Sequence, residues 1–398
     1  MKFEDLIAPL SKEEFFNDYF EKKPCYFGQV HPGFESVLSL KDIDHAINSF
    51  IFTPPEFRMA KEGVITPKNL YADSNNKRKT EEEYINFAKV LALYADGSTM
   101  IFESLHEKLK GLGDFCQQME LTFQNNVQSN IYLTPPGSKG FARHFDTHEV
   151  FVLQISGTKE WIIYDNPPIE LPVRQHSHTP FKEFEYPVKE RFVLKPGESV
   201  YIPRGYMHEA KSNTDLSLHV TFGLVTYNFK DFLEDLLNDA QLTNVFLRNS
   251  IPLEILKGER PAADLVKSFA SNLSSINNEQ MIANLLEKRK NYFLSTRVPR
   301  IEKGLSSIDS LSAITSETQL IRVEHLPYLI EESGDKVNLK VFNKTLSFPA
   351  AIKPYLEFIC ESDGFTTDDL GDNLSESSKK VLVEKLIKES IIQIAKPS

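Results

Sequence analysis

The sequence predicts a mixed α and β fold, with a central β-sandwich or barrel between two largely helical regions. Residues 121–227 contain many short segments rich in β-branched and aromatic residues, and Gly and Pro turns separate these segments. On both sides of this region apolar residues recur at three- and four-residue intervals, which is typical of helices. The length of 398 residues allows two or three domains.

The composition favours a soluble globular protein of the cytoplasm. The residues are 41% hydrophobic and 25% charged, and no run of about 18 apolar residues could span a membrane. Residues 1–16 lack the apolar stretch of a secretion signal. The three cysteines, Cys25, Cys116 and Cys360, are too few and too widely spaced for a disulfide framework or a cysteine-rich zinc site.

The net charge of −11 limits the classes of partner. A nucleic-acid-binding protein is normally basic, so we expect no direct nucleic-acid binding. An acidic surface attracts basic molecules, which makes a basic protein substrate a candidate partner.

The first hundred or so residues are expected to be mixed but mostly helical. Ser11 and Glu14 have the spacing of a capping box, and the helix that they begin is expected to stop at Pro24. Residues 82–94 and 99–119 show helical periodicity again, so helices are predicted there too.

Beyond Tyr227 the helical pattern returns, and it divides the rest of the chain into two parts. Helices are predicted at residues 229–247, 263–276 and 278–294, and at 350–362 and 377–395 near the end. Residues 301–320, rich in Ser and Thr, are expected to be a linker, and residues 336–342 and 345–348 are expected to be strands. The predicted domains are therefore residues 1–227, 228–305 and 306–398.

The segment from Arg143 to Glu149 carries the side chains best suited to bind a metal. His144, Asp146 and His148 alternate along an expected strand, so they point to the same side. Residues two apart on a strand lie about 6.6 Å from each other, so two of the three can reach one ion with bonds of about 2.1 Å but all three cannot. A third ligand must therefore come from a distant segment. Two histidines and one carboxylate on one face leave three positions open, which is what non-heme iron needs for a cosubstrate and dioxygen.

Four histidines are candidates for this third ligand. His176 and His178 lie in an irregular polar stretch, where exposed histidines are common. His219 lies in an apolar strand and suits a core position or a place beside the ligands. His208 follows a buried-looking strand and a tight Pro-Arg-Gly turn, which fixes the backbone rigidly enough to place a ligand. The sequence favours His208 and leaves the others open.

A lysine and two polar strand residues could complete the site. Lys159 shares an expected strand face with Trp161 and Ile163, where a lysine either extends to solvent or pairs with an anion. Next to a metal site for oxygen chemistry, it could receive the distal carboxylate of a dicarboxylate cosubstrate. Asn130 and Tyr132 alternate with apolar residues, so they could line a pocket or belong to an ordinary half-exposed strand.

Two of these segments resemble a known family. The sequences NIYLTPPGSKGFARHFDTHEVFVLQISGTKEW (residues 130–161) and LKPGESVYIPRGYMHEA (residues 194–210) are similar to the JmjC-type ribosomal oxygenases, also called the cupin-4 family. The resemblance extends over roughly residues 10–230. It implies a double-stranded β-helix (jelly-roll) catalytic core, followed by a helical dimerisation segment in 228–305 and a winged-helix-like domain in 306–398. The last part has 10 basic and 14 acidic residues from position 311 on, so it suits an interaction or structural module better than a DNA reader.

The resemblance also implies an activity and its residues. Iron(II) would be held by His144, Asp146 and His208, 2-oxoglutarate would pair with Lys159 and contact Asn130 and Tyr132, and dioxygen would be the oxidant. The expected reaction is hydroxylation of a histidine or arginine side chain of a protein, with a ribosomal protein as substrate, by a homodimer. Three alternatives stay open: the same chemistry on another peptide or a small molecule, a catalytically inactive binding module, and a cupin metalloenzyme that does not use 2-oxoglutarate.

Overall fold

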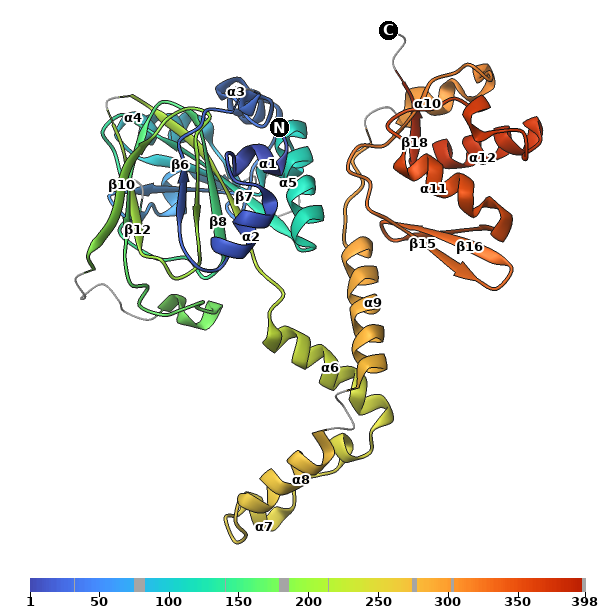
Figure 1. Cartoon of the computed structure of the whole chain (residues 1–398). Coiled ribbons are helices and arrows are strands. Elements are labelled where there is room, and N and C mark those ends of the chain that lie inside the picture. The colour runs from blue at the N-terminus through green and yellow to red at the C-terminus, as the bar shows by residue number, and fades with distance from the viewer. Residues whose placement is uncertain are drawn as a thin grey trace. The chain divides into compact units, whose positions relative to one another are not determined.

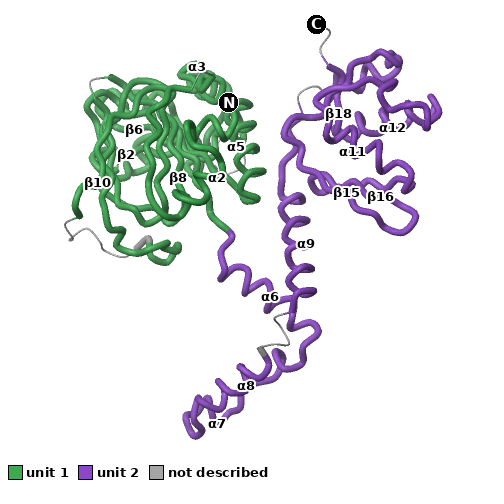
Figure 2. Tube along the Cα trace, viewed as in Figure 1, with its two compact units in different colours: residues 1–226 green, residues 227–398 purple. Residues whose placement is uncertain are grey.

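The structure is a computed structural model that describes residues 1–31, 33–74, 83–139, 141–178, 186–213, 215–273, 278–301 and 304–395. The chain forms two compact units, Met1–Thr226 and Tyr227–Ser398, which are coloured separately in Figure 2. Each unit is described by itself.

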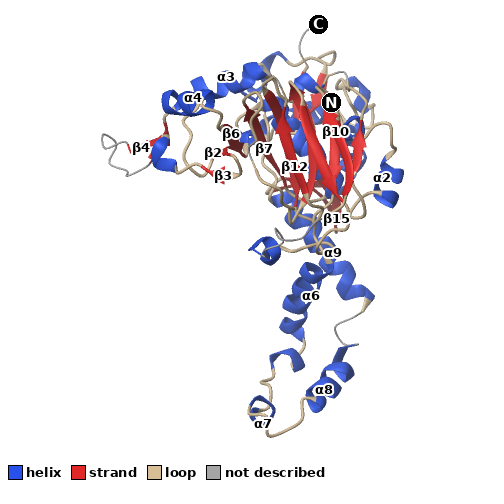
Figure 3. Cartoon of the chain, turned by 90° about the vertical axis from the view of Figure 1, so that its left-hand side faces the viewer, coloured by secondary structure: helices blue, strands red, loops and turns tan. Residues whose placement is uncertain are grey.

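Two antiparallel β-sheets form the centre of the first unit, in agreement with the predicted sandwich (Figures 1 and 3). In spatial order, the larger sheet consists of β1 (Cys25–Phe27), β11 (Ser199–Ile202), β8 (Glu149–Ser156), β13 (Ser217–Leu224), β7 (Val127–Thr134), β6 (Thr99–Glu103), β2 (Phe57–Lys61) and β3 (Val64–Ile65). The smaller sheet consists of β10 (Val188–Leu194), β9 (Lys159–Tyr164) and β12 (His208–Ser212). A separate pair is formed by β4 (Ala72–Ser74) and β5 (Glu83–Ile85).

Alternation along the strands gives the larger sheet two different faces. On β8, Phe151 and Leu153 belong to the large hydrophobic core, whereas Val150 and Val152 pack with Trp161 of the smaller sheet. Because successive side chains of a strand point to opposite faces, one face is covered by helices and the other faces the smaller sheet. The interior between the sheets is therefore lined from both sides.

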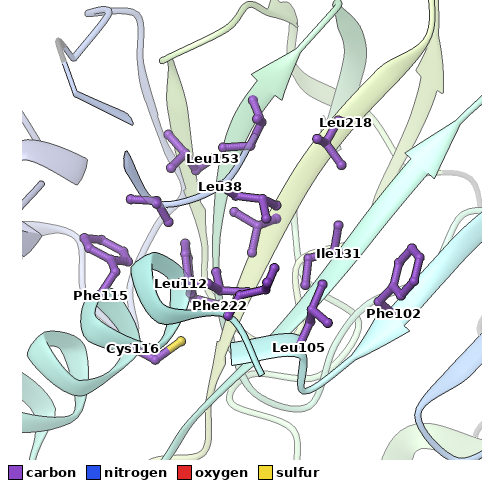
Figure 4. Close-up of a cluster of buried hydrophobic side chains, with 14 of the residues drawn as sticks. Leu38, Phe102, Leu105, Leu112, Phe115, Cys116, Ile131, Leu153, Leu218 and Phe222 are labelled. Carbon is purple, nitrogen blue, oxygen red and sulfur yellow. The ribbon is translucent and has the colours of Figure 1, made fainter. Parts of the chain in front are cut away.

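Helices cover the first of these faces. They are α1 (Phe3–Leu6), α2 (Lys12–Asp18), α3 (Leu40–Ser49), α4 (Phe87–Ala95) and α5 (Lys110–Phe123). Figure 4 shows Leu112 and Phe115 of α5 in one cluster with Ile131 and Phe222 of the sheet, and the rings of Phe115 and Phe222 lie 4.9 Å apart. The predicted capping box of α2 is confirmed, since the Ser11 and Glu14 side chains each accept from the other residue's backbone amide.

Several predictions of local structure in the first unit were wrong. Residues 99–103 form strand β6 instead of the start of a helix, because pairing with β7 and β2 determines their conformation. The region before residue 104, which was expected to be mixed but mostly helical, has helices α1 to α4 and also contributes strands β1, β2, β3 and β6 to the larger sheet. The segment from His144 to Asp146, called the H-x-D segment below, is also not part of the predicted strand: β8 starts at Glu149, and His144 makes an isolated bridge to His208.

The second unit begins with helices and continues with a small α and β region. The helices are α6 (Phe229–Thr243), α7 (Leu253–Leu256), α8 (Ala263–Leu273), α9 (Glu279–Ser295) and α10 (Gly304–Asp309). An antiparallel sheet follows, made of β15 (Tyr328–Ser333), β16 (Lys336–Val341) and β17 (Lys344–Pro349), together with helices α11 (Lys353–Glu361) and α12 (Glu376–Lys388) and the pair β14 (Leu320–Arg322) and β18 (Ile392–Ile394). In the described parts of the chain, every helix is too short or too polar to cross a bilayer.

Two predictions for this unit were wrong. The expected linker contains helix α10, whose Ser307 is buried. The helix predicted for residues 377–395 ends at Lys388, and the chain then returns as β18 to pair with β14. The winged-helix character of this part stays a prediction.

Candidate active site

A cavity of about 300 Å³ lies between the two sheets of the first unit. Strands β7 and β13 line it with Asn130, Tyr132, His219 and Thr221, and the smaller sheet lines it with Lys159, Trp161, His208 and Ala210. His144, Asp146 and His148 reach it from the segment before β8. All six residues that the sequence proposed for the metal and the cosubstrate therefore lie around one cavity.

His144, Asp146 and His208 come close enough to share a metal ion. Each offers one ligand atom, and these atoms lie within 4.8 Å of one another. The Asp146 carboxylate lies 4.0 Å from Nε2 of His144 and 3.5 Å from Nε2 of His208. Two atoms bound to one metal at about 2.1 Å lie at most about 4.2 Å apart, so small side-chain rotations bring all three onto one ion.

Backbone contacts hold the two ligand-bearing segments together. The amide of His144 donates to the carbonyl of His208 at 3.1 Å, and the amide of His208 donates to the carbonyl of His144 at 2.8 Å. The Nδ1 atoms of His144 and His208 lie 2.9 and 3.0 Å from the carbonyls of Ala142 and Tyr206. Since Nδ1 is hydrogen-bonded in both rings, Nε2 is the ring nitrogen that could bind a metal.

The protonation states suit metal binding. Burial, followed by the nearby His144, lowers the pKa of His208 to about 4, so its imidazole is neutral near pH 7. Burial opposes ionisation of Asp146, but His144, His148 and His208 together hold its pKa below the usual value. A neutral imidazole and an ionised carboxylate are the forms that bind metals.

His148 is the member of the H-x-D-x-H pattern that stays outside the three-ligand group. It is half-buried and lines the same cavity. A Cβ atom on Gly223 would lie 2.8 Å from Cδ2 of His148, so the glycine of β13 leaves room for this ring. The group of possible ligand atoms within 4.8 Å of one another consists of His144, Asp146 and His208, so His148 is outside it.

Lys159 is a buried amine that has no acidic partner among the described residues. Its side chain belongs to a residue that is only 4% exposed, and its Nζ lies 3.3 Å from Oγ1 of Thr134. Burial lowers the pKa of Lys159 to about 7. A buried amine in such a place favours an anionic ligand, because the anion would compensate the charge that burial penalises.

Asn130 and Tyr132 line the cavity from β7 of the larger sheet, across from Lys159 of the smaller sheet. The ring of Tyr132 stacks on that of His219, with 4.8 Å between centroids and an angle of 7°. Burial raises the pKa of Tyr132, so its hydroxyl stays protonated. Asn130, with its amide turned to satisfy its hydrogen bonds, donates to Glu103 at 2.9 Å.

The two histidines of the irregular polar stretch are not placed at the cavity. His176 is not among the cavity-lining residues, and its Nδ1 accepts from the amide of Val173 at 3.1 Å. The His178 side chain lies outside the described residues.

Sequence reasoning missed several residues of this cavity. Arg58 of β2 lines it, forms a 2.6 Å ion pair with Glu103 and lies over the ring of Phe141 at 5.5 Å. Thr99 and Thr221 line it too. The segment of Thr99 was predicted to be helical, which hid its place in the sheet. Thr221 carried a usable signal, since it is two residues from His219 on the same strand.

Three comparisons place the chain among known proteins. Residues 104–232 match the JmjC domain family. The chain is 26% identical over 357 residues to ribosomal oxygenase 2 of Rattus norvegicus, an alignment that covers 84% of this chain and 73% of that protein. It is 31% identical over 261 residues to the bifunctional lysine-specific demethylase and histidyl-hydroxylase NO66 of Drosophila persimilis, covering 63% of this chain and 36% of that protein.

A solved structure supports the fold. The crystal structure of the Escherichia coli ribosomal oxygenase YcfD has a TM-score of 0.54 with this chain at 16% sequence identity, and the match covers 97% of this chain and 98% of that one. This likeness agrees with the jelly-roll arrangement of the two sheets. The likeness to YcfD concerns the fold, whereas the JmjC match and the curated relatives concern the chemistry. Residues 104–232 form a JmjC domain, the chain is similar to the ribosomal oxygenases, and it is a 2-oxoglutarate-dependent dioxygenase that uses iron(II) and dioxygen.

Proposed function

We propose that this chain hydroxylates a side chain of a ribosomal protein at the cavity between its two sheets. One observation carries the proposal: two histidines and one aspartate line the same cavity as a buried lysine, and no acidic residue in the described part of the chain pairs with this lysine. The names of the relatives, ribosomal oxygenase and histidyl-hydroxylase, agree with this substrate class.

Each residue around the cavity has a role in the proposal. His144, Asp146 and His208 hold the iron, and their arrangement on one face leaves positions open for other ligands. Lys159, with the Thr134 hydroxyl beside it, binds the distal carboxylate of 2-oxoglutarate. Asn130 and Tyr132 contact the same cosubstrate. When bound, the iron, 2-oxoglutarate and dioxygen supply the oxidising chemistry that converts a C–H bond of the substrate into a C–OH group. The apolar walls formed by Val150 and Trp161 restrict water near the reacting atoms.

Histidine suits the cavity better than arginine as the side chain to be hydroxylated. Asp146 is the only acidic residue among the described residues that line it, and the proposed role of Asp146 is to bind the metal. Glu103, which lies nearby, is paired with Arg58 at 2.6 Å. A guanidinium group would therefore bring a further positive charge into a cavity that already contains Arg58 and Lys159, and it would find no free carboxylate to pair with. Burying an unpaired charge is unfavourable, and a neutral imidazole avoids this penalty.

The helical part of the second unit supports a homodimer as part of the proposal. Phe229, Leu233 and Leu237 recur every four residues on α6, and their exposed fractions are 85%, 51% and 39%. A stripe of this kind is typical of a helix face that packs against another surface. The acidic net charge of the chain supports a basic protein substrate and no direct binding of nucleic acid.

The proposal is tested by assaying purified ribosomal proteins. Anaerobically purified enzyme would receive iron(II), 2-oxoglutarate and oxygen, and mass spectrometry would search for peptides that gain one oxygen atom. We expect one modified histidine in the wild type and none with Asp146→Ala. Hydroxylation of a different peptide or of a small molecule would redirect the substrate assignment. Folded, iron-loaded protein that forms no succinate with any substrate would favour a binding module.

A further inference from the structure

We infer that Glu149 and Arg204 form a positioning pair that sets the separation of Asp146 and His208 and thereby the affinity for the metal. Neither residue lines the cavity, and neither offers a ligand atom. The inference rests on the proposed metal site.

The pair joins the two segments that carry the metal ligands. Glu149 follows Asp146 by three residues and is the first residue of β8. Arg204 precedes His208 by four residues and lies in the turn between β11 and β12. An Arg204 guanidinium nitrogen lies 2.9 Å from Oε1 of Glu149, and the two residues are 9% and 0% exposed. An ion pair in this place connects the aspartate side of the metal site to the histidine side.

Both charged groups have further partners that fix their orientation. The Tyr201 hydroxyl donates to the Glu149 carboxylate and accepts from the amide of Glu21 at 2.9 Å. Arg204 also lies 2.8 Å from the Glu21 carboxylate and donates to Oγ1 of Thr226 at 2.9 Å. Burial raises the pKa of Glu149 to about 7, while the hydrogen bond from Tyr201 and the charge of Arg204 act against this shift. The carboxylate therefore depends on these partners for its charge at neutral pH.

Backbone contacts join the two segments on one side of Asp146 and at Asp146 itself. The amides and carbonyls of His144 and His208 pair with each other, and the amide of Gly205 donates to the carbonyl of Asp146 at 2.9 Å. The Arg204–Glu149 contact adds a side-chain attachment three residues beyond Asp146. With attachments on both sides of it, Asp146 has less freedom to move relative to His208. The Glu149 and Arg204 side chains thus orient Asp146 toward His208.

A contribution to the stability of the fold does not by itself explain the buried ion pair between Glu149 and Arg204. A buried ion pair is often no more stabilising than apolar residues of the same volume, since taking two charges out of water offsets their attraction. Groups that orient metal ligands have a different effect, because their loss weakens metal binding by about 10- to 100-fold. Metal affinity and stability can therefore be separated by experiment.

The test measures cobalt(II) affinity of the full chain from its visible absorption, with the thermal midpoint of metal-free protein measured in parallel. Glu149→Gln keeps the shape of the side chain and one oxygen acceptor but removes the negative charge. Arg204→Lys keeps the positive charge but removes the planar guanidinium group, whose nitrogen donors have a fixed geometry. We expect both variants to fold and to bind cobalt about tenfold more weakly. Tyr201→Phe, which removes one hydroxyl, provides a milder variant and should weaken binding less. Arg191→Gln, which breaks the exposed pair with Glu160 on the smaller sheet, is the matched control and should bind as the wild type does.

Unchanged cobalt affinity in folded Glu149→Gln and Arg204→Lys would overturn the inference. A loss that disappears when the assay is cooled well below the thermal midpoint would also overturn it, since the pair would then act only on stability. Asp146→Ala separates this failure from a wrong metal site: if that variant binds cobalt normally, the three-ligand proposal itself is at fault.

Discussion

Nζ of Lys159 and Oγ1 of Thr134 lie 3.3 Å apart in the interior of the first unit, and no carboxylate among the described residues pairs with the lysine. An amine with a pKa of about 7 in such a place is suited to receive the charge of a ligand. The first two predictions follow from this relationship.

Replacing Lys159 should weaken cosubstrate binding while leaving the metal in place. A hydrogen bond to a charged group contributes about 1.5–3 kcal/mol, so Lys159→Met should raise the Kd for 2-oxoglutarate by about 10- to 100-fold. Calorimetric titration of the cobalt-substituted protein measures this directly. Lys211→Met, at an exposed position on β12, is the control and should bind normally. Equal affinity in Lys159→Met and the wild type would remove the lysine from the proposed site.

Binding of 2-oxoglutarate should be accompanied by proton uptake at pH 8. With its pKa at about 7, Lys159 is mostly neutral at this pH in the empty cavity, and a bound carboxylate raises that pKa. Affinity should therefore fall as the pH rises above about 7. Titrations in buffers with different ionisation enthalpies measure the uptake. Lys159→Met corrects for protons exchanged at the metal, and an uptake that is the same in both proteins would contradict the prediction.

The three proposed metal ligands should differ sharply from the other histidines. His144→Ala, Asp146→Ala and His208→Ala should each lose the visible absorption of bound cobalt and reduce product formation by at least about 100-fold, because each removes a bond to the ion. His176→Ala, which replaces a histidine outside the cavity, should keep both. If any of the three retains full cobalt affinity, that residue is not a ligand.

A methyl group on Gly223 should disturb His148 without removing the metal. Because the added Cβ would lie 2.8 Å from the His148 ring, Gly223→Ala forces the ring to move, and overpacking of this kind costs about 1–3 kcal/mol. We expect a higher KM for the protein substrate at unchanged cobalt affinity. The double variant Gly223→Ala/His148→Ala relieves the contact and should regain the lost stability. A double variant no more stable than Gly223→Ala would show that the strain lies elsewhere.

Charges on the apolar stripe of α6 should dissociate the proposed dimer. Leu233→Asp places a carboxylate where burial against a second copy would be expected, and an unpaired buried charge is strongly unfavourable. Sedimentation velocity should show a dimer for the wild type and a monomer for the variant. Ile51→Asp, at a position 65% exposed in the first unit, should leave the mass unchanged. A monomeric wild type would end the dimer proposal.

The sequence predicted the parts of the site that depend on local patterns. Alternation in residues 127–134 and 159–164 made Tyr132 and Lys159 candidates for a pocket, and the rigid turn before His208 favoured it over three other histidines. All three residues line the cavity. Arg58 and Thr99 could not be found this way. Their strands β2 and β6 are short, and a short apolar run such as Met100–Phe102 fits a helix or a strand equally well until distant partners decide.

The two faces of the central strands also limit how the protein can evolve. On β7, Ile131 and Leu133 pack beneath the helices while Asn130 and Tyr132 line the cavity, and on β13 Val220 and Phe222 are opposed in the same way to His219 and Thr221. Loss of a single residue from such a strand would exchange its faces, so that polar groups would enter the core and apolar groups the cavity. Deletions within these strands should therefore abolish both folding and activity. New substrate preferences can arise by substitution at the inward positions or by changes of length in the connecting loops.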